Sequence, residues 1–253
     1  MSPALSRLKG VARLLGTLVH ILRGLWIIRW RFPAMDKDTR ERTVQAWAQQ
    51  ALSVMGMGLE VQGSPPPAGP VLLVANHISW LDILVVHATG HCRFVSKADV
   101  RSWPLIGTMA TAAGTLYIER ESRRDALRVV YQMAASLQAA EVLAVFPEGT
   151  TSDGTGLLPF HANLLQAALA SNAPAQPVSI DYIDVASGQS SLAPIYVGDD
   201  TLVASLWRTL TAPATRARVR FGEPEPAQGR DRRAWAADLR QRVLDLRAGG
   251  SGL

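Results

Sequence analysis

Residues 3–30 carry apolar side chains at helical spacing, with basic side chains between them. At about 100° per residue, one side of a helix would hold the basic residues Lys9, Arg13, His20 and Arg23, and the other the apolar residues Leu8, Val11, Leu15, Leu18, Leu22, Leu25 and Trp26. No acidic residue precedes Asp36. The pattern predicts an amphipathic helix lying in the plane of an anionic membrane surface. The alternative is an ordinary amphipathic helix packed on its own domain.

After a second helix predicted over residues 36–57, the turn-rich stretch 63–70 ends the helical pattern. Beyond it, short apolar runs predict strands at 71–74, 93–96, 115–118, 143–146 and 178–182. Helical patterns between and after them predict helices at 81–88, 123–140, 163–169 and 230–247. This alternation favours an α/β fold with a mixed sheet flanked by helices, preceded by the N-terminal amphipathic helical membrane-binding segment.

The same pattern predicts three parts of the chain. Residues 1–62 form a helical membrane-associated segment, residues 70–225 form the main domain, and residues 228–253 form a C-terminal amphipathic helix and tail. In that last helix, Trp235, Leu239, Val243 and Leu246 are expected to face inward. Its arginines are expected to form a solvated face, with lipid contact as the less favoured alternative.

Composition narrows the partners and the compartment. The 253 residues are 48% hydrophobic and carry a formal net charge of +5, which favours an anionic partner such as acidic lipid, a phosphorylated substrate or nucleic acid. The one cysteine, Cys92, forms no internal disulfide and indicates a reducing compartment. No neighbour in the sequence suggests that its thiol is activated as a nucleophile.

Candidate chemistry begins directly after the apolar run 71–74, in the sequence Asn76-His-Ile-Ser-Trp-Leu-Asp82. A neutral imidazole at His77 can take a proton from a hydroxyl, and a carboxylate on its other nitrogen would fix the tautomer. Asp82 lies five residues further on, so the two side chains meet only if His77 precedes the helix and the chain bends between them.

Two further motifs follow apolar runs. Phe146-Pro-Glu-Gly-Thr150 places a charge, Glu148, between two residues that force a special backbone. Gly114-Thr-Leu-Tyr-Ile-Glu-Arg120 ends a predicted strand with a guanidinium that could bind a phosphate in bidentate fashion. A plain turn and a surface salt bridge are the simpler readings of these two motifs.

In this order, and followed by Pro177, the three motifs resemble the glycerolipid acyltransferase family (1-acylglycerol-3-phosphate and lysophospholipid acyltransferases) over roughly residues 70–185. The resemblance implies direct transfer of a fatty acyl group from acyl-CoA or acyl-carrier protein to the free hydroxyl of a lysophospholipid. It implies no cofactor, no metal and no nucleic acid, and a place at the cytoplasmic face of a membrane, the bacterial inner membrane. The first choice of acceptor is 1-acylglycerol-3-phosphate, giving phosphatidate.

The resemblance also assigns residues. His77 is the expected base and Asp82 its orienting partner. The expected substrate-binding residues are Asn76, Arg120, Glu148, Gly149, Thr150 and Pro177.

Two positions depart from the family pattern. Phe-Pro-Glu-Gly-Thr is commonly followed by Arg-Ser, where this chain has Thr151-Ser152, and a common later Phe-Lys reads Phe160-His161. A dianionic phosphomonoester normally wants cations at such positions. A similar continuation occurs in relatives that acylate lyso-ornithine lipid, which is therefore the alternative acceptor.

Three other classes of protein, namely a metalloprotein, a serine hydrolase and a lipid-binding module, fit the sequence less well. His87 and His91, one helical turn apart, could suggest a metal site, but no H-E-x-x-H pattern accompanies them. A serine hydrolase would need a G-x-S-x-G elbow, which the sequence lacks. A non-enzymatic basic lipid-binding module would explain the charge and the N-terminal helix, but would leave the ordered motifs as coincidence.

Overall fold

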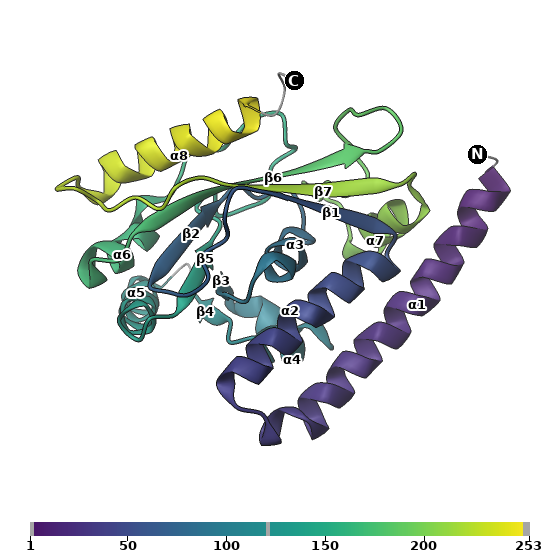
Figure 1. Ribbon diagram of the computed structural model, residues 1–253, viewed down its shortest axis with the longest axis horizontal. Helices are drawn as coiled ribbons and strands as arrows, with labels where there is room; N and C mark the ends of the chain where they lie inside the picture. Colours follow the sequence, from purple (N-terminus) through teal and green to yellow (C-terminus); the bar gives the residue numbers. More distant parts are fainter. Residues whose placement is uncertain (1–2, 120–121, 250–253) are drawn as a thin grey trace.

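The computed structural model describes residues 3–119 and 122–249 and folds them around one seven-stranded sheet (Figure 1). The strand order is β1-β7-β6-β2-β5-β3-β4, and every neighbouring pair is parallel except β6 and β7. The strands are β1 (Met57–Gln62), β2 (Val71–Ala75), β3 (Arg93–Lys97), β4 (Leu116–Ile118), β5 (Val142–Val145), β6 (Ala175–Asp184) and β7 (Thr215–Phe221). The sheet is mixed, as the sequence predicted.

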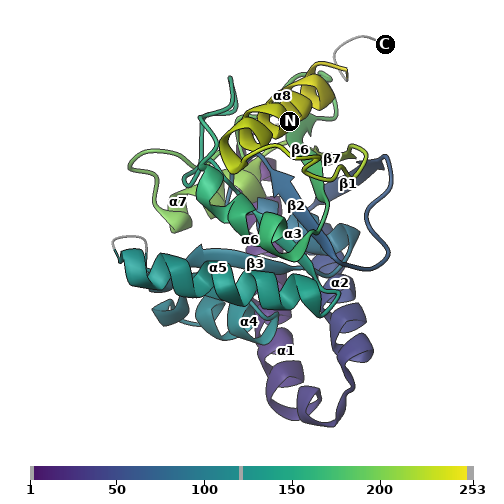
Figure 2. The ribbon, with the colours of Figure 1, turned by 90° about the vertical axis from the view of Figure 1, so that its left-hand side faces the viewer.

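Helices cover both faces of the sheet (Figure 1, Figure 2). On one face lie α2 (Lys37–Val54), α3 (Asp82–Thr89) and α7 (Leu202–Thr211), and on the other α5 (Arg123–Gln138), α6 (Leu165–Ser171) and α8 (Arg232–Ala248). The short helix α4 (Ile106–Ala112) contacts α1 (Pro3–Trp30). Because side chains alternate along a strand, Leu73 and Ala75 of β2 enter the first core, whereas Leu72 and Val74 enter the second.

The five strands predicted from apolar runs are all present, and two strands and two α-helices were missed. β7 reads Thr-Arg-Ala-Arg-Val-Arg-Phe, and its arginines hid the alternation in which Ala217 and Val219 are fully buried. β1 falls inside residues 1–62, where the sequence predicted only helices, and it pairs with β7 at the edge of the sheet. The missed helices are α4 and α7. The division into residues 1–62, 70–225 and 228–253 stays a prediction.

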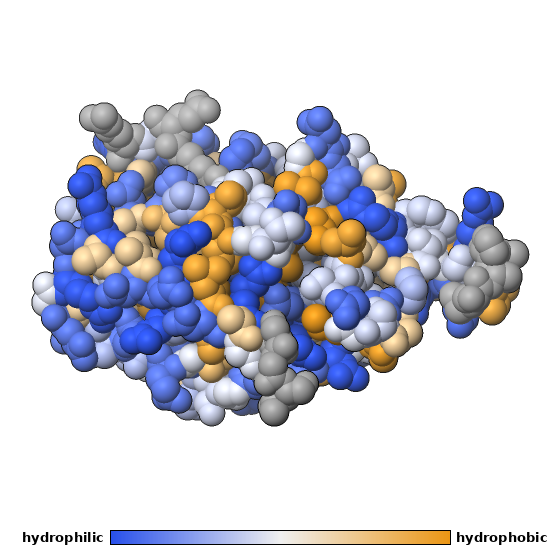
Figure 3. All heavy atoms as spheres, turned by 90° about the horizontal axis from the view of Figure 1, so that it is seen from above, coloured by the Kyte–Doolittle hydropathy of each residue, from blue (hydrophilic) through white to orange (hydrophobic). Residues whose placement is uncertain are grey.

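α8 packs as predicted, with its apolar side on the sheet. Trp235, Leu239 and Val243 are fully buried. The surface seen from above, on the side of α8, is mainly hydrophilic with apolar patches between the polar side chains (Figure 3).

α1 packs in the opposite sense, with its polar and small residues against α2 and α7 (Figure 1). A Cβ atom on Gly24 would lie 2.7 Å from Nε1 of Trp47, and one on Gly10 would lie 2.5 Å from Thr211, so both glycines permit a close approach. The apolar side faces outward, with Leu8, Leu15 and Leu22 between 58% and 68% exposed. α1 therefore packs on its own domain, as the alternative expects, but not by its apolar side.

Of the four basic residues expected on one side of α1, Arg13 and His20 pack against protein, whereas Lys9 and Arg23 are exposed. Arg13 donates to the carbonyls of Leu210 (2.9 Å) and Ala212 (3.3 Å), at the C-terminal end of α7. The His20 ring stacks on Trp47 with centroids 4.7 Å apart, and its Nε2 lies 3.0 Å from the Trp47 carbonyl oxygen. The expectation that Arg13 and His20 lie opposite the apolar side is confirmed, but they contact protein, because the polar side is the packed side.

Candidate active site

The site is built at the end of β2, where the chain turns through residues 76–81 into α3. Asn76, fully buried, fixes this turn to β6: its Nδ2 donates to the carbonyl of Ile180 (3.0 Å), and its Oδ1 accepts from the Ile180 N–H (2.7 Å). The amide thus satisfies two buried main-chain groups and continues the pairing of β2 with β6 by one residue. Asn76 was predicted to bind substrate, but both polar atoms of its side chain are hydrogen-bonded to the main chain.

His77 and Asp82 meet across this turn. Nδ1 of His77 lies 2.9 Å from Oδ2 of Asp82. The same oxygen accepts the backbone N–H groups of Ile78 (2.7 Å) and Ser79 (2.9 Å), which bends the chain back over the first turn of α3. The bend that the five-residue spacing requires is therefore present, and the amino end of α3 favours the carboxylate charge.

Tyr182 is a site residue that the sequence analysis missed. Its hydroxyl donates to Oδ1 of Asp82 (2.7 Å), so the fully buried carboxylate accepts four hydrogen bonds. These bonds offset the desolvation of the charge. Burial, reinforced by the charge of Asp82, raises the pKa of Tyr182 well above its ordinary value, so the phenol keeps its proton and donates.

Phe146, the first residue of the second motif, sets the plane of the His77 ring. The two rings stack almost in parallel, with centroids 4.0 Å apart, and Phe146 stacks in turn on Phe94 of β3. The His77 side chain is 18% exposed. Because Asp82 accepts from Nδ1, that nitrogen carries the proton and Nε2 is left to act as a base.

Glu148 joins the second motif to the turn that carries His77. Oε1 accepts the His77 N–H (2.7 Å), and Oε2 accepts the Leu158 N–H (2.8 Å). Burial raises the pKa of this carboxyl, while the two backbone bonds oppose that rise. The backbone N–H of Ser152 also donates to the His77 carbonyl (2.8 Å). Glu148 was predicted to bind substrate, but both of its carboxylate oxygens accept hydrogen bonds from main-chain N–H groups.

The remaining residues predicted to bind substrate differ in how far they are buried. Gly149 has a φ of +73°, which glycine adopts without strain, and Thr150 beside it is exposed. Pro177 is buried in β6 opposite Val74 of β2, and its carbonyl accepts from the Gly222 N–H. Arg120 lies outside the described residues. The structure thus brings Asn76, His77, Asp82 and Glu148 together at one turn.

The surroundings of His87, His91 and Cys92 do not favour catalysis by these residues. Burial lowers the pKa of His87 to about 3, so its ring stays neutral, and His91 lies 5.7 Å away between ring centroids. Burial raises the pKa of the Cys92 thiol, which opposes a nucleophilic role. Within residues 3–119 and 122–249, no group of three or more His, Cys, Asp or Glu side chains is placed to hold a metal ion.

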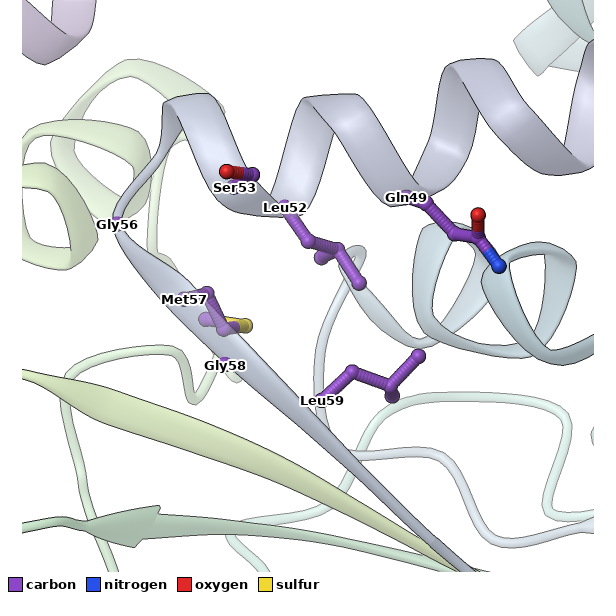
Figure 4. Close-up of a pocket in the computed structure, with 7 residues that line it drawn as sticks. All are labelled: Gln49, Leu52, Ser53, Gly56, Met57, Gly58 and Leu59. Carbon is purple, nitrogen blue, oxygen red and sulfur yellow. The ribbon is translucent and has the colours of Figure 1, made fainter.

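A cavity of about 440 Å³ lies between α2 and β1, away from His77, and side chains point into it from both elements (Figure 4). It is lined by Gln49, Leu52, Ser53, Gly56, Met57, Gly58 and Leu59. Nε2 of Gln49 donates a hydrogen bond to the Ala88 carbonyl of α3 (2.9 Å). This cavity contains none of the predicted site residues.

A family model described as "Acyltransferase" matches residues 58–181. The lyso-ornithine lipid O-acyltransferase of Pseudomonas aeruginosa is 38% identical over 236 residues, which cover 92% of this chain and 90% of that protein. The 1-acyl-sn-glycerol-3-phosphate acyltransferase of Neisseria gonorrhoeae is 39% identical over 185 residues, covering 72% and 71%.

Among solved structures, the 1-acyl-sn-glycerophosphate (LPA) acyltransferase PlsC from Thermotoga maritima has the same fold, with a TM-score of 0.70 at 20% identity. The match covers 98% of this chain and 100% of that one. The His77 turn and Glu148 lie inside the region that the family model matches, and similar proteins span nearly the whole chain. The protein therefore belongs to the acyltransferase family and is an acyltransferase.

Proposed function

We propose that the enzyme moves a fatty acyl group from acyl-CoA or acyl-carrier protein to the free hydroxyl of a lysolipid. The observation that carries this proposal is the His77–Asp82 pair at 2.9 Å, which leaves Nε2 of His77 as a base at a partly exposed position. Asp82 is already saturated with donors, so its role is to orient the imidazole and stabilise the imidazolium.

The steps follow from this arrangement. Nε2 of His77 removes the proton of the acceptor hydroxyl as its oxygen forms a bond to the thioester carbonyl carbon. The tetrahedral intermediate collapses, the carbon–sulfur bond breaks, and the imidazolium returns the proton to the leaving thiolate. An ester and a free thiol result, and no acyl-enzyme is formed. Asn76 and Glu148 act as positioning residues that hold the turn carrying His77.

Of the two acceptors considered, we favour lyso-ornithine lipid over 1-acylglycerol-3-phosphate. Thr151 and His161 stand where a phosphomonoester site would have firmly charged side chains. Two similar proteins named lyso-ornithine lipid O-acyltransferase also align over more of the chain, and the one from Pseudomonas aeruginosa does so over 236 residues. The one from Brucella abortus is 36% identical over 242 residues, compared with 185 aligned residues for the gonococcal 1-acyl-sn-glycerol-3-phosphate acyltransferase.

We also propose that α1 seats the enzyme on the cytoplasmic face of a bacterial inner membrane. From Leu5 to Trp30 the helix is long and apolar enough, by length and composition, to cross a bilayer. Its polar side, however, is taken up by α2 and α7, so we place it in the plane of one leaflet with Leu8, Leu15 and Leu22 toward the acyl chains. The reducing compartment indicated by Cys92 fits this side of the membrane.

The test is acyl transfer by the full chain in phospholipid vesicles, from labelled acyl-CoA and acyl-carrier protein to both lysolipids. His77→Ala should lower the rate by about 10²- to 10⁴-fold, the usual contribution of a general base. His91→Gln, outside the site, is the matched control and should retain activity. Full activity of His77→Ala would refute the general-base role. Vesicle binding without transfer to any lysolipid would instead favour the lipid-binding module.

A further inference from the structure

We propose that α8 positions the catalytic turn: Arg240 and Arg247 act as positioning residues that hold residues 154–158 in place, and through them Glu148 and His77. This inference rests on the proposed function, because it concerns how the same site is held. The loop involved follows the Phe-Pro-Glu-Gly-Thr motif, in the region where the chain departs from the family pattern.

Arg240 binds two successive carbonyls of this loop. Its Nε donates to the Leu158 carbonyl (3.1 Å), and its Nη2 donates to the Leu157 carbonyl. A planar guanidinium presents its donors in a fixed fork, so the two bonds fix the direction of the peptide as well as its place. Leu157 is buried, which keeps this part of the loop against the protein.

Leu158 passes this restraint on to the active site. The Leu157 carbonyl, which accepts from Arg240, and the Leu158 N–H, which donates to Oε2 of Glu148 (2.8 Å), belong to the same peptide group. The other oxygen of Glu148 accepts the N–H of His77 (2.7 Å). A continuous path of hydrogen bonds therefore runs from α8 to the main chain of the general base, and its links are a guanidinium, one peptide and one buried carboxylate.

Arg247 holds the beginning of the same loop. It donates to the carbonyls of Gly154 and Gly156, and its Nε lies 3.2 Å from Oδ1 of Asp181. Asp181 is fixed from the other side by Arg220, 2.6 Å away. Asp181 follows Ile180, which Asn76 holds, and precedes Tyr182, which holds Asp82. Three successive residues of β6 thus anchor three parts of the site.

The expectation that the arginines of α8 form a solvated face is wrong for these two residues. The Arg247 side chain is 18% exposed, whereas that of Arg242, on the same helix, is 62% exposed. Arg233 is also exposed and lies in the first turn of α8. The helix therefore offers its own control position.

The test compares Arg240→Gln with Arg233→Gln in the vesicle transfer assay. Loss of the fork should lower kcat about tenfold and leave KM for the lysolipid nearly unchanged, because the residue acts on the base and does not touch substrate. Arg240→Lys, which keeps the charge but not the fork, should recover part of the loss. Arg233→Gln should behave as the parent enzyme.

A double-mutant cycle with Glu148→Gln separates positioning from general destabilisation. If Arg240 acts through Glu148, adding Arg240→Gln to Glu148→Gln should cost little further activity. Two losses that multiply in full, or an Arg240→Gln enzyme within about twofold of the parent, would overturn the inference. If Arg240→Gln does not fold, Arg240→Lys and Arg247→Gln are measured in the same cycle. An inactive parent enzyme would instead refute the proposed function.

Discussion

α1 and α8 are both arginine-containing amphipathic helices near the ends of the chain, and they pack in opposite senses. α8 buries Trp235, Leu239 and Val243 on the sheet. α1 buries its polar and small side and leaves Leu15 and Trp26 more than half exposed, at 58% and 53%. Hydrophobic periodicity predicted the two sides of each helix, but it did not decide which side contacts the protein.

In α1, a row of small residues decides which side of the helix contacts the protein. Gly10, Thr17 and Gly24 recur every seven residues and let α1 approach its neighbours closely. Leucine at these positions would hold the helices apart. In both helices arginine then serves the same purpose, since Arg13 and Arg240 each donate to two main-chain carbonyls of another segment. A basic residue on an amphipathic helix is therefore weak evidence for a lipid or solvent contact.

The largest expected effect is on stability, and it separates the two helices. Trp235→Ala should lower the free energy of unfolding by about 3–5 kcal/mol, the usual cost of truncating a fully buried aromatic side chain. Trp26→Ala, the matched change in α1, should cost about 0.5 kcal/mol or less, because this indole is 53% exposed. Urea unfolding in detergent, followed by circular dichroism, measures both. Equal losses would mean that the apolar side of α1 packs on protein.

The next largest effect is on membrane binding, which should depend on α1 and not on α8. Leu15→Glu combined with Leu22→Glu removes two exposed apolar side chains, each contributing about 1.5–3 kcal/mol when buried, so vesicle affinity should fall by about 100-fold or more. Arg233→Glu on α8 makes the same change in net charge and is the control. Co-sedimentation with anionic vesicles measures both variants. A similar loss in the control would show that charge, and not the apolar side of α1, drives binding.

Much of the fold followed from the sequence, because apolar runs in buried strands are explicit. β2 and β5 are such runs, and the structure has strands where they were predicted. β7 was missed because it alternates arginine with buried residues, and Arg220 is itself buried through its ion pair with Asp181. Asp181, which offsets the cost of burying the Arg220 charge, lies 39 residues away along the chain. No local pattern in the sequence predicts this ion pair.

The site divides in the same way. Nδ1 of His77 and Oδ2 of Asp82 meet as predicted, since their contact depends on a local bend. Glu148 was recognised by its motif, but its engagement with two main-chain donors was not, because those donors lie 71 and 10 residues away. Tyr182 is 100 residues from Asp82 and had no signal beyond its place in a predicted strand. Spacing predicts local geometry, whereas contacts between distant segments require the fold.

The smallest expected effect concerns how firmly α1 is held, and it depends on pH. Burial lowers the pKa of His20 below its ordinary value of 6.5, the bond to the Trp47 carbonyl opposes this, and the charge of Arg23 adds to the lowering. A lowered pKa means that detached α1 binds the proton more readily, so packing is strongest above about pH 6.5 and weakens as the pH falls through the lowered value.

Hydrogen exchange of the full chain in detergent, corrected for the intrinsic rate, measures this effect. Between about pH 7.5 and pH 5, amides of α1 should lose protection relative to those of α8, which contains no histidine. His20→Gln should abolish the difference between the helices, because the glutamine does not titrate. Protection of α1 that is independent of pH in the parent protein would show that His20 stays neutral without cost to the packing. The packing of α1 on α2 and α7 would then depend on Arg13, Gly10 and Gly24, and not on the protonation state of His20.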